Sequence, residues 1–93
     1  MAQNTTVTLP ANEWVQLTDA DVTSMTFQNI GGSHMLVKGA ASAATPTNFT
    51  GCIRYNPGQG ELNTALSDLF PGISAVRVYA YSPGGVPVMV SHA

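Results

Sequence analysis

The side chains with the greatest chemical capacity in this sequence are two histidines and a single cysteine, which are far apart along the chain. Neither His34 nor His92 has a cysteine or a second histidine at a spacing typical of zinc ligands. Cys52 has no histidine nearby in the sequence to act as its base. We interpret His34 as an outward-facing strand residue, His92 as part of a fraying tail and Cys52 as a packed thiol within a strand. The sequence therefore predicts a protein that is not an enzyme, with no catalytic residues and no metal or cofactor site.

Two aspartates form the next candidate group. Asp19 and Asp21 are two residues apart and are flanked by threonines, and closely spaced oxygens are what Ca²⁺ binds. The segment lacks the glycine and the distant glutamate of a calcium-binding loop. We therefore interpret both aspartates as turn residues between two strands, where their side chains bond to nearby backbone amides.

Three aromatic residues form the third group, because flat aromatic faces beside polar groups bind sugar rings. Tyr79 and Tyr81 share one face of a predicted strand with Arg77, whereas Trp14 fits either the surface or the core. Most aromatic side chains of a small domain belong to its core or to an interface. A glycan platform made of Trp14, Tyr79 and Tyr81 is therefore kept as an alternative function.

Short runs of alternating apolar and polar residues, separated by turn residues, predict an all-β fold. The expected strands cover residues 4–9, 14–17, 22–29, 34–38, 49–55, 73–81 and 86–91. About seven or eight short strands fit a single antiparallel two-sheet sandwich or jelly roll. Residues 63–70 have room for at most one helical turn, capped near Asn63.

The glycine-rich links Gly31–Ser33 and Ser82–Gly85 are each expected to join the strands on either side as a hairpin, because glycine adopts positive φ. Residues 39–48 are small or polar and contain no large apolar group. That segment is expected to be an exposed, adaptable loop.

Composition limits the partners of the chain. Its 93 residues correspond to one domain, and they include three Lys or Arg and five Asp or Glu, which is 9% of the chain. Ordinary soluble domains have about 25% charged residues, so the surface is unusually neutral. No basic stripe is present to bind nucleic acid, and no apolar run is long enough to cross a membrane. Such a surface suits contacts with other proteins, because few ions need to be desolvated.

Several segments, taken in chain order, carry a resemblance to a known family. They are the Thr-rich start Asn4–Leu9, then Glu13–Thr18, Phe27–Gly32, the Ala-Ser-Thr-Pro loop, Tyr55–Gly58, Arg77–Ala80 and the end of the Val-rich last strand, Val90–Ala93. Together they resemble the small all-β capsid decoration, or cement, proteins and head-fibre modules of tailed bacteriophages.

The resemblance implies a virion protein made in the host cytoplasm without a signal peptide. It implies binding to the major capsid protein on the outside of the capsid, commonly as a trimer. Residues 1–6 are expected to form an N-terminal arm that adds to a neighbour as an edge strand. The expected contact residues lie in this arm and in the loop, and they are Asn4, Thr5, Thr6, Thr45, Pro46 and Asn48. The alternative is a carbohydrate-binding or adhesion module of a fibre.

Overall fold

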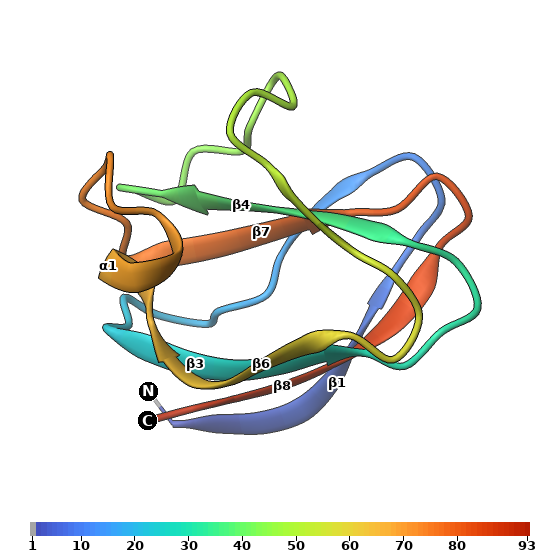
Figure 1. Ribbon diagram of the computed structural model, residues 1–93, viewed down its shortest axis with the longest axis horizontal. Helices are drawn as coiled ribbons and strands as arrows, with labels where there is room; N and C mark the ends of the chain where they lie inside the picture. Colours follow the sequence, from blue (N-terminus) through green and yellow to red (C-terminus); the bar gives the residue numbers. More distant parts are fainter. Residues whose placement is uncertain (1) are drawn as a thin grey trace.

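The computed structural model describes residues 2–93, and these form eight strands in two antiparallel sheets that face each other across one core (Figure 1). The first sheet has the order β1 (Gln3–Leu9), β8 (Val86–His92), β3 (Ser24–Asn29) and β6 (Gly60–Ala65). The second sheet has the order β2 (Trp14–Gln16), β7 (Arg77–Tyr81), β4 (Met35–Ala40) and β5 (Ile53–Tyr55). The predicted all-β, two-sheet class is confirmed.

The strand pairing follows one rule: each strand counted from the start of the chain pairs with its counterpart counted from the end. Thus β1 pairs with β8, β2 with β7, β3 with β6 and β4 with β5. Additional pairing of β3 with β8 and of β4 with β7 completes the two sheets. A long hairpin rolled up in this way is the eight-stranded jelly roll. Both ends of the chain therefore lie side by side in Figure 1.

The alternation along the strands determines which side chains enter the core. Val88 and Val90 on β8 are fully buried, and Met25 and Phe27 on the neighbouring strand β3 lie beside them in the core. Met35 and Val37 on β4 close the core from the second sheet. Each such side chain stabilises the fold by roughly 1.5–3 kcal/mol when it is fully buried. These inward-facing residues are the ones that the sequence pattern predicts.

The two predicted hairpins are wrong. β3 and β4, on either side of Gly31–Ser33, lie in different sheets, and so do β7 and β8, on either side of Ser82–Gly85. Alternation identifies the face that a strand buries, but it does not identify the neighbouring strand. Each of these strands has one apolar face. Because each link crosses from one sheet to the other, the apolar faces of the two strands that it joins are buried in the same core.

A buried asparagine fixes the first of these crossings. The Asn29 side-chain amide donates hydrogen bonds to the carbonyl oxygens of Ser33, at 2.8 Å, and Tyr55, at 3.2 Å. Its side-chain oxygen accepts a bond from the Gly31 N–H at 3.0 Å. Because the side chain is fully buried and uses both its donor and its acceptor, it can hold the chain at the turn from one sheet to the other.

One short helix follows β6. α1 (Leu66–Leu69) is the predicted helical turn, but its N-cap is Ala65, without a side-chain hydrogen bond, and not Asn63. Asn63 lies in β6, with a positive φ of 43°. Within residues 2–93, no helix has the length and apolar character needed to cross a membrane.

Both ends of the chain are part of the first sheet. Residues 3–6 of the expected arm belong to β1 and pair with β8 of the same chain, while residue 1 lies outside the described residues. Gln3 is opposite His92, and the two side chains are joined at 2.8 Å between Oε1 and Nε2. His92 is therefore buried in a paired strand, and the prediction of a fraying tail is wrong. Gln3, its hydrogen-bond partner, comes from the opposite end of the described chain.

Candidate functional site

Three aromatic rings meet on the outer side of the second sheet. Trp14 on β2 stacks against Phe49, with ring centroids 5.3 Å apart and an angle of 29° between the planes. Tyr81 on β7 completes the cluster, at 5.4 Å from Trp14 and 4.9 Å from Phe49. Offset and edge-to-face pairs at these distances contribute about 0.5–1.5 kcal/mol each beyond the area that they bury. We refer to Trp14, Phe49 and Tyr81 as the aromatic cluster.

The loop between β4 and β5 brings Phe49 to the cluster. Lys38 on β4 donates from Nζ to Asn48 Oδ1 at 2.7 Å, and this oxygen also accepts from the Thr50 N–H at 3.1 Å. Gly51, with a φ of 77°, closes the turn that leads into β5. These contacts fix the end of a loop that projects beyond the sheet in Figure 1. Phe49 was expected in a strand, but the strand begins only at Ile53.

Tyr79 does not belong to an open platform, although it was predicted as part of one. Its exposed fraction is 3%, and its hydroxyl donates to Gln16 Oε1 at 2.9 Å. Trp14 and Tyr81 are half-buried, and Phe49 is 47% exposed. The exposed ring of the cluster is therefore Phe49, which sequence analysis missed. A single large aromatic residue at the end of a loop of small residues was the available signal.

The predicted contact residues lie in two separate regions. Asn4, Thr5 and Thr6 are exposed on β1 and pair with Ser91, Val90 and Met89 of β8. Thr45 and Asn48 are exposed in the β4–β5 loop, and Pro46 there is half-buried. The loop is exposed as expected. The first set belongs to the first sheet, whereas the loop follows β4 of the second sheet, so the structure does not unite them in one site.

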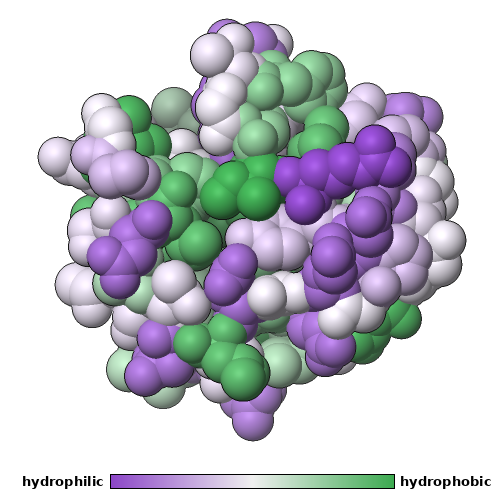
Figure 2. Space-filling model, in the orientation of Figure 1, coloured by the Kyte–Doolittle hydropathy of each residue, from purple (hydrophilic) through white to green (hydrophobic). Residues whose placement is uncertain are grey.

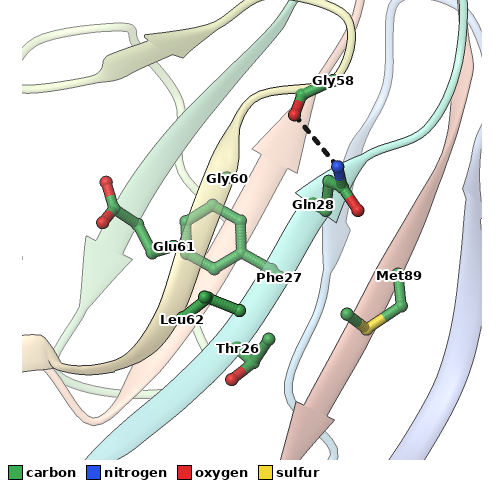
Figure 3. Close-up of a pocket in the computed structure, with 8 residues that line it drawn as sticks. All are labelled: Thr26, Phe27, Gln28, Gly58, Gly60, Glu61, Leu62 and Met89. Atoms are coloured by element: carbon green, nitrogen blue, oxygen red, sulfur yellow. Dashed lines mark hydrogen bonds between the residues drawn. The ribbon is translucent and has the colours of Figure 1, made fainter.

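A shallow pocket of about 250 Å³ lies on the first sheet (Figure 3). Figure 3 shows Met89 of β8 on one side, Leu62 of β6 on the other, and Thr26 and Gln28 of β3 between them. The Gln28 amide donates to the Gly58 carbonyl at 3.0 Å. Small-molecule sites are usually larger, about 300–1,000 Å³, with several polar groups converging on the ligand. The volume of this depression is below that range.

A second pocket, of about 380 Å³, lies between the β4–β5 loop and the segment that follows α1. Phe70 and Ile73 provide apolar walls, and Lys38 lines it with an ammonium group already bonded to Asn48. On the face shown in Figure 2, green apolar groups are separated by purple polar ones. Lys38 and Thr50 are the polar side chains among its lining residues, and the Lys38 ammonium already has a partner.

The titratable groups are dispersed. Asp21 Oδ1 pairs with Arg77 Nε at 2.7 Å, whereas Asp19 Oδ1 is 3.2 Å from His92 Nε2. Each aspartate thus has its own partner, which explains why the two carboxylates do not converge. Across residues 2–93, no three His, Cys, Asp or Glu side chains are grouped as metal ligands.

Two side chains have perturbed acidity for structural reasons. Burial raises the pKa of the Cys52 thiol, and the Lys38 charge partly opposes this effect. Burial also raises the pKa of the Tyr55 phenol, which the hydrogen bond to Glu61 Oε2, at 3.0 Å, and the charge of Glu61 raise further. Cys52 lies in the turn before β5, so its predicted place within a strand is wrong. A raised pKa keeps the thiol in its less nucleophilic, protonated form.

Comparisons of the chain with protein-family models, with curated proteins and with solved structures found no match.

Proposed function

We propose that this chain is a non-enzymatic structural protein of a virion, which decorates and stabilises the outer surface of a tailed-phage capsid. The observation that carries the proposal is a surface with few charges on which four large apolar side chains are exposed. These residues are Ile30, Phe49, Leu62 and Ile73. The phage context comes from the resemblance of the sequence segments, since a jelly roll also occurs in lectins and cupins.

The neutral surface suits contact with a protein shell. Interface cores are depleted of charged residues and enriched in aromatic ones, because a buried ion pays a desolvation penalty. The apolar residues come from different segments, with Ile30 after β3, Phe49 in the β4–β5 loop and Leu62 on β6. Each contact is modest, but many copies on one shell would together clamp adjacent subunits of the major capsid protein.

The proposal includes assembly as a symmetric homo-oligomer on the capsid. A trimer is the state that the resemblance implies. Synthesis in the host cytoplasm, followed by binding to the finished shell, is part of the same proposal.

The test is the copy number of this chain in purified particles, measured by quantitative mass spectrometry against the major capsid protein. We expect hundreds of copies in a fixed ratio. A handful of copies would indicate a fibre component instead, and absence from the particles would overturn the proposal. Adding the purified chain to particles that lack it should restore the same ratio, and Phe49→Asp should lower that occupancy.

A carbohydrate-binding module is the second candidate, favoured by the aromatic cluster. Phe49 covers one face of Trp14, so a sugar ring would have to stack on Phe49 or displace it. A glycan array tests this function, with Tyr81→Ala and Trp14→Ala expected to abolish a reproducible signal. An array without signal, together with binding to bare capsids, would support the decoration role.

A further inference from the structure

Edge strands of a sheet expose unpaired backbone groups, and natural proteins protect them with charges, prolines, bulges or short length. Three of the four edges among residues 2–93 are protected in this way. β2 and β5 have three residues each, and β5 includes Arg54. β6 includes Glu61, its register with β3 shifts between Met25 and Phe27, and Asn63 has a positive φ. Such features oppose pairing with another strand.

The fourth edge, β1, has none of these features. All seven of its residues, Gln3–Leu9, pair with β8 in unbroken register, and the strand contains no charged residue, glycine or proline. Asn4, Thr5, Thr6 and Thr8 are exposed. Within the described chain, their side chains make no hydrogen bond. The longest edge strand of the described chain is therefore regularly paired, mostly polar and uncharged, and its outer edge is open.

We propose that β1 is the interface for a second copy of this chain, pairing antiparallel across a two-fold axis to make one continuous eight-stranded sheet. A two-fold axis perpendicular to the sheet keeps the inner face of both copies on the same side. The backbone N–H and C=O groups on the free edge then find partners, which is the chemistry of strand addition.

The sequence of β1 suits pairing with itself. A strand without charge meets no like-charge repulsion when it is placed opposite its own copy, whereas β5 would bring Arg54 near Arg54. Threonines at positions 5, 6 and 8 would face threonine or other uncharged side chains, and Thr–Thr pairs across strands are favourable. Among homo-oligomers, two-fold dimers are also the most common form.

The burial of side chains along β1 also supports an interface at this edge. On the face towards the core, Leu9 is buried, Val7 and Gln3 are half-buried and Thr5 is exposed. The inward-facing side chains of β1 are thus least covered at Thr5, and a second copy at this edge would cover it. Thr6 and Asn4, on the other face, would meet exposed side chains of the second copy.

The contact makes a dimer, in place of the trimer that the resemblance implies. It does not rest on the capsid-decoration proposal, because it concerns the free chain in solution. A single strand pair is smaller than the roughly 1,200–2,000 Å² of standard stable interfaces, so we expect weak association that repeated copies would reinforce.

The test is sedimentation equilibrium of the whole chain at concentrations up to about 1 mM, the range in which a weak interface is populated. We expect a species of twice the 9.7 kDa chain mass. Thr6→Lys, in the middle of the strand, should raise the dissociation constant at least about tenfold by placing two positive charges close together across the strand pair. The matched control is Leu62→Lys on the opposite edge of the same sheet, where the side chain is 84% exposed, and it should leave the constant unchanged. Circular dichroism checks that both variants fold.

Disulfide cross-linking tests the geometry separately. In a Cys52→Ser background, single cysteines at positions 4, 6 and 8 test the register, because a residue lies opposite its own copy only at the two-fold axis and a disulfide needs Cα atoms within about 7 Å. We expect cross-linked dimers at position 6, in the middle of β1, and little cross-linking at positions 4 and 8. Three results would overturn the proposal: a monomer at every concentration, association that Thr6→Lys leaves intact, or a dimer without cross-links at all three positions. None of these readouts involves particles, so failure here is distinct from failure of capsid binding.

Discussion

The side-chain amide of Asn29, at the end of β3, donates a 3.2 Å hydrogen bond to the main-chain carbonyl of Tyr55, at the end of β5. This bond joins the first sheet to the second, since β3 and β5 belong to different sheets. A polar link of this kind inside an apolar core is costly to break, because each separated group loses its partner without gaining water.

Replacing Asn29 by alanine should therefore destabilise the protein strongly. The change leaves the Gly31 N–H and the carbonyls of Ser33 and Tyr55 without their partner, and we expect a loss of about 2–4 kcal/mol in the free energy of unfolding. Urea denaturation measures it. The neighbouring Gln28→Ala removes one exposed bond and should cost less than about 1 kcal/mol. Equal losses in the two variants would contradict the role given to Asn29.

The two adjacent glycines of the β3–β4 link should respond differently to alanine. A Cβ at Gly31 would lie 2.6 Å from the Val86 Cβ, whereas a Cβ at Gly32 would meet nothing within 4 Å. We expect Gly31→Ala to lower the unfolding free energy by about 1–3 kcal/mol through overpacking, and Gly32→Ala to change it by less than about 0.5 kcal/mol. Thermal melts of both variants under one condition provide the measurement. If Gly31→Ala were as stable as the parent, the close approach to Val86 would be wrong.

Removing the Phe49 ring should expose Trp14, the only tryptophan of the chain. Phe49→Ala is expected to shift tryptophan fluorescence to the red and to lower stability by about 1–2 kcal/mol. Ile73→Ala is the matched control, because Ile73 is 48% exposed against 47% for Phe49. The control should leave the fluorescence unchanged. An unshifted spectrum in Phe49→Ala would show that the ring does not cover Trp14 in solution.

Stability should fall at alkaline pH because of Tyr55. Its pKa is raised in the folded state by burial and by Glu61, so the neutral phenol contributes stability that is present below the ordinary tyrosine pKa of about 10 and is lost as pH rises above it. Melting temperatures between pH 8 and 11 should fall less steeply in Tyr55→Phe. Both chains should carry Cys52→Ser, because the raised pKa of that thiol adds a dependence of the same sign. Parallel curves for the two chains would contradict the prediction.

Inward-facing residues could be predicted from the sequence because alternation is a local property. Val86, Val88 and Val90 follow a period of two, and all three are buried. The pairing partners could not be predicted in the same way, because the contacts that select them join distant segments. Gly31 packs against Val86, and Asn29 bonds to Tyr55. Neither contact can be predicted from the alternation of apolar and polar residues along one strand.

In the candidate site, too, local sequence patterns did not reveal all the contacts. Trp14 and Tyr81 are two of the three residues of the alternative aromatic platform, and the register of β2 with β7 places them opposite each other. Tyr79 shows that a side chain on the outer face of a sheet need not be open to solvent, because it is buried and its hydroxyl is bonded to Gln16. Phe49 was missed because a short turn, and not a strand, carries it.

The rolled hairpin also constrains how the chain folds. The β4–β5 pair joins segments close in sequence, whereas β1 must wait for β8, which is synthesised much later. Folds dominated by such distant pairings fold slowly, because the entropy of loop closure is lost before the contacts form. During synthesis β1 would therefore emerge from the ribosome long before its partner. An uncharged strand left waiting in this way has two unpaired edges, so it can pair with strands other than β8 until β8 has been synthesised.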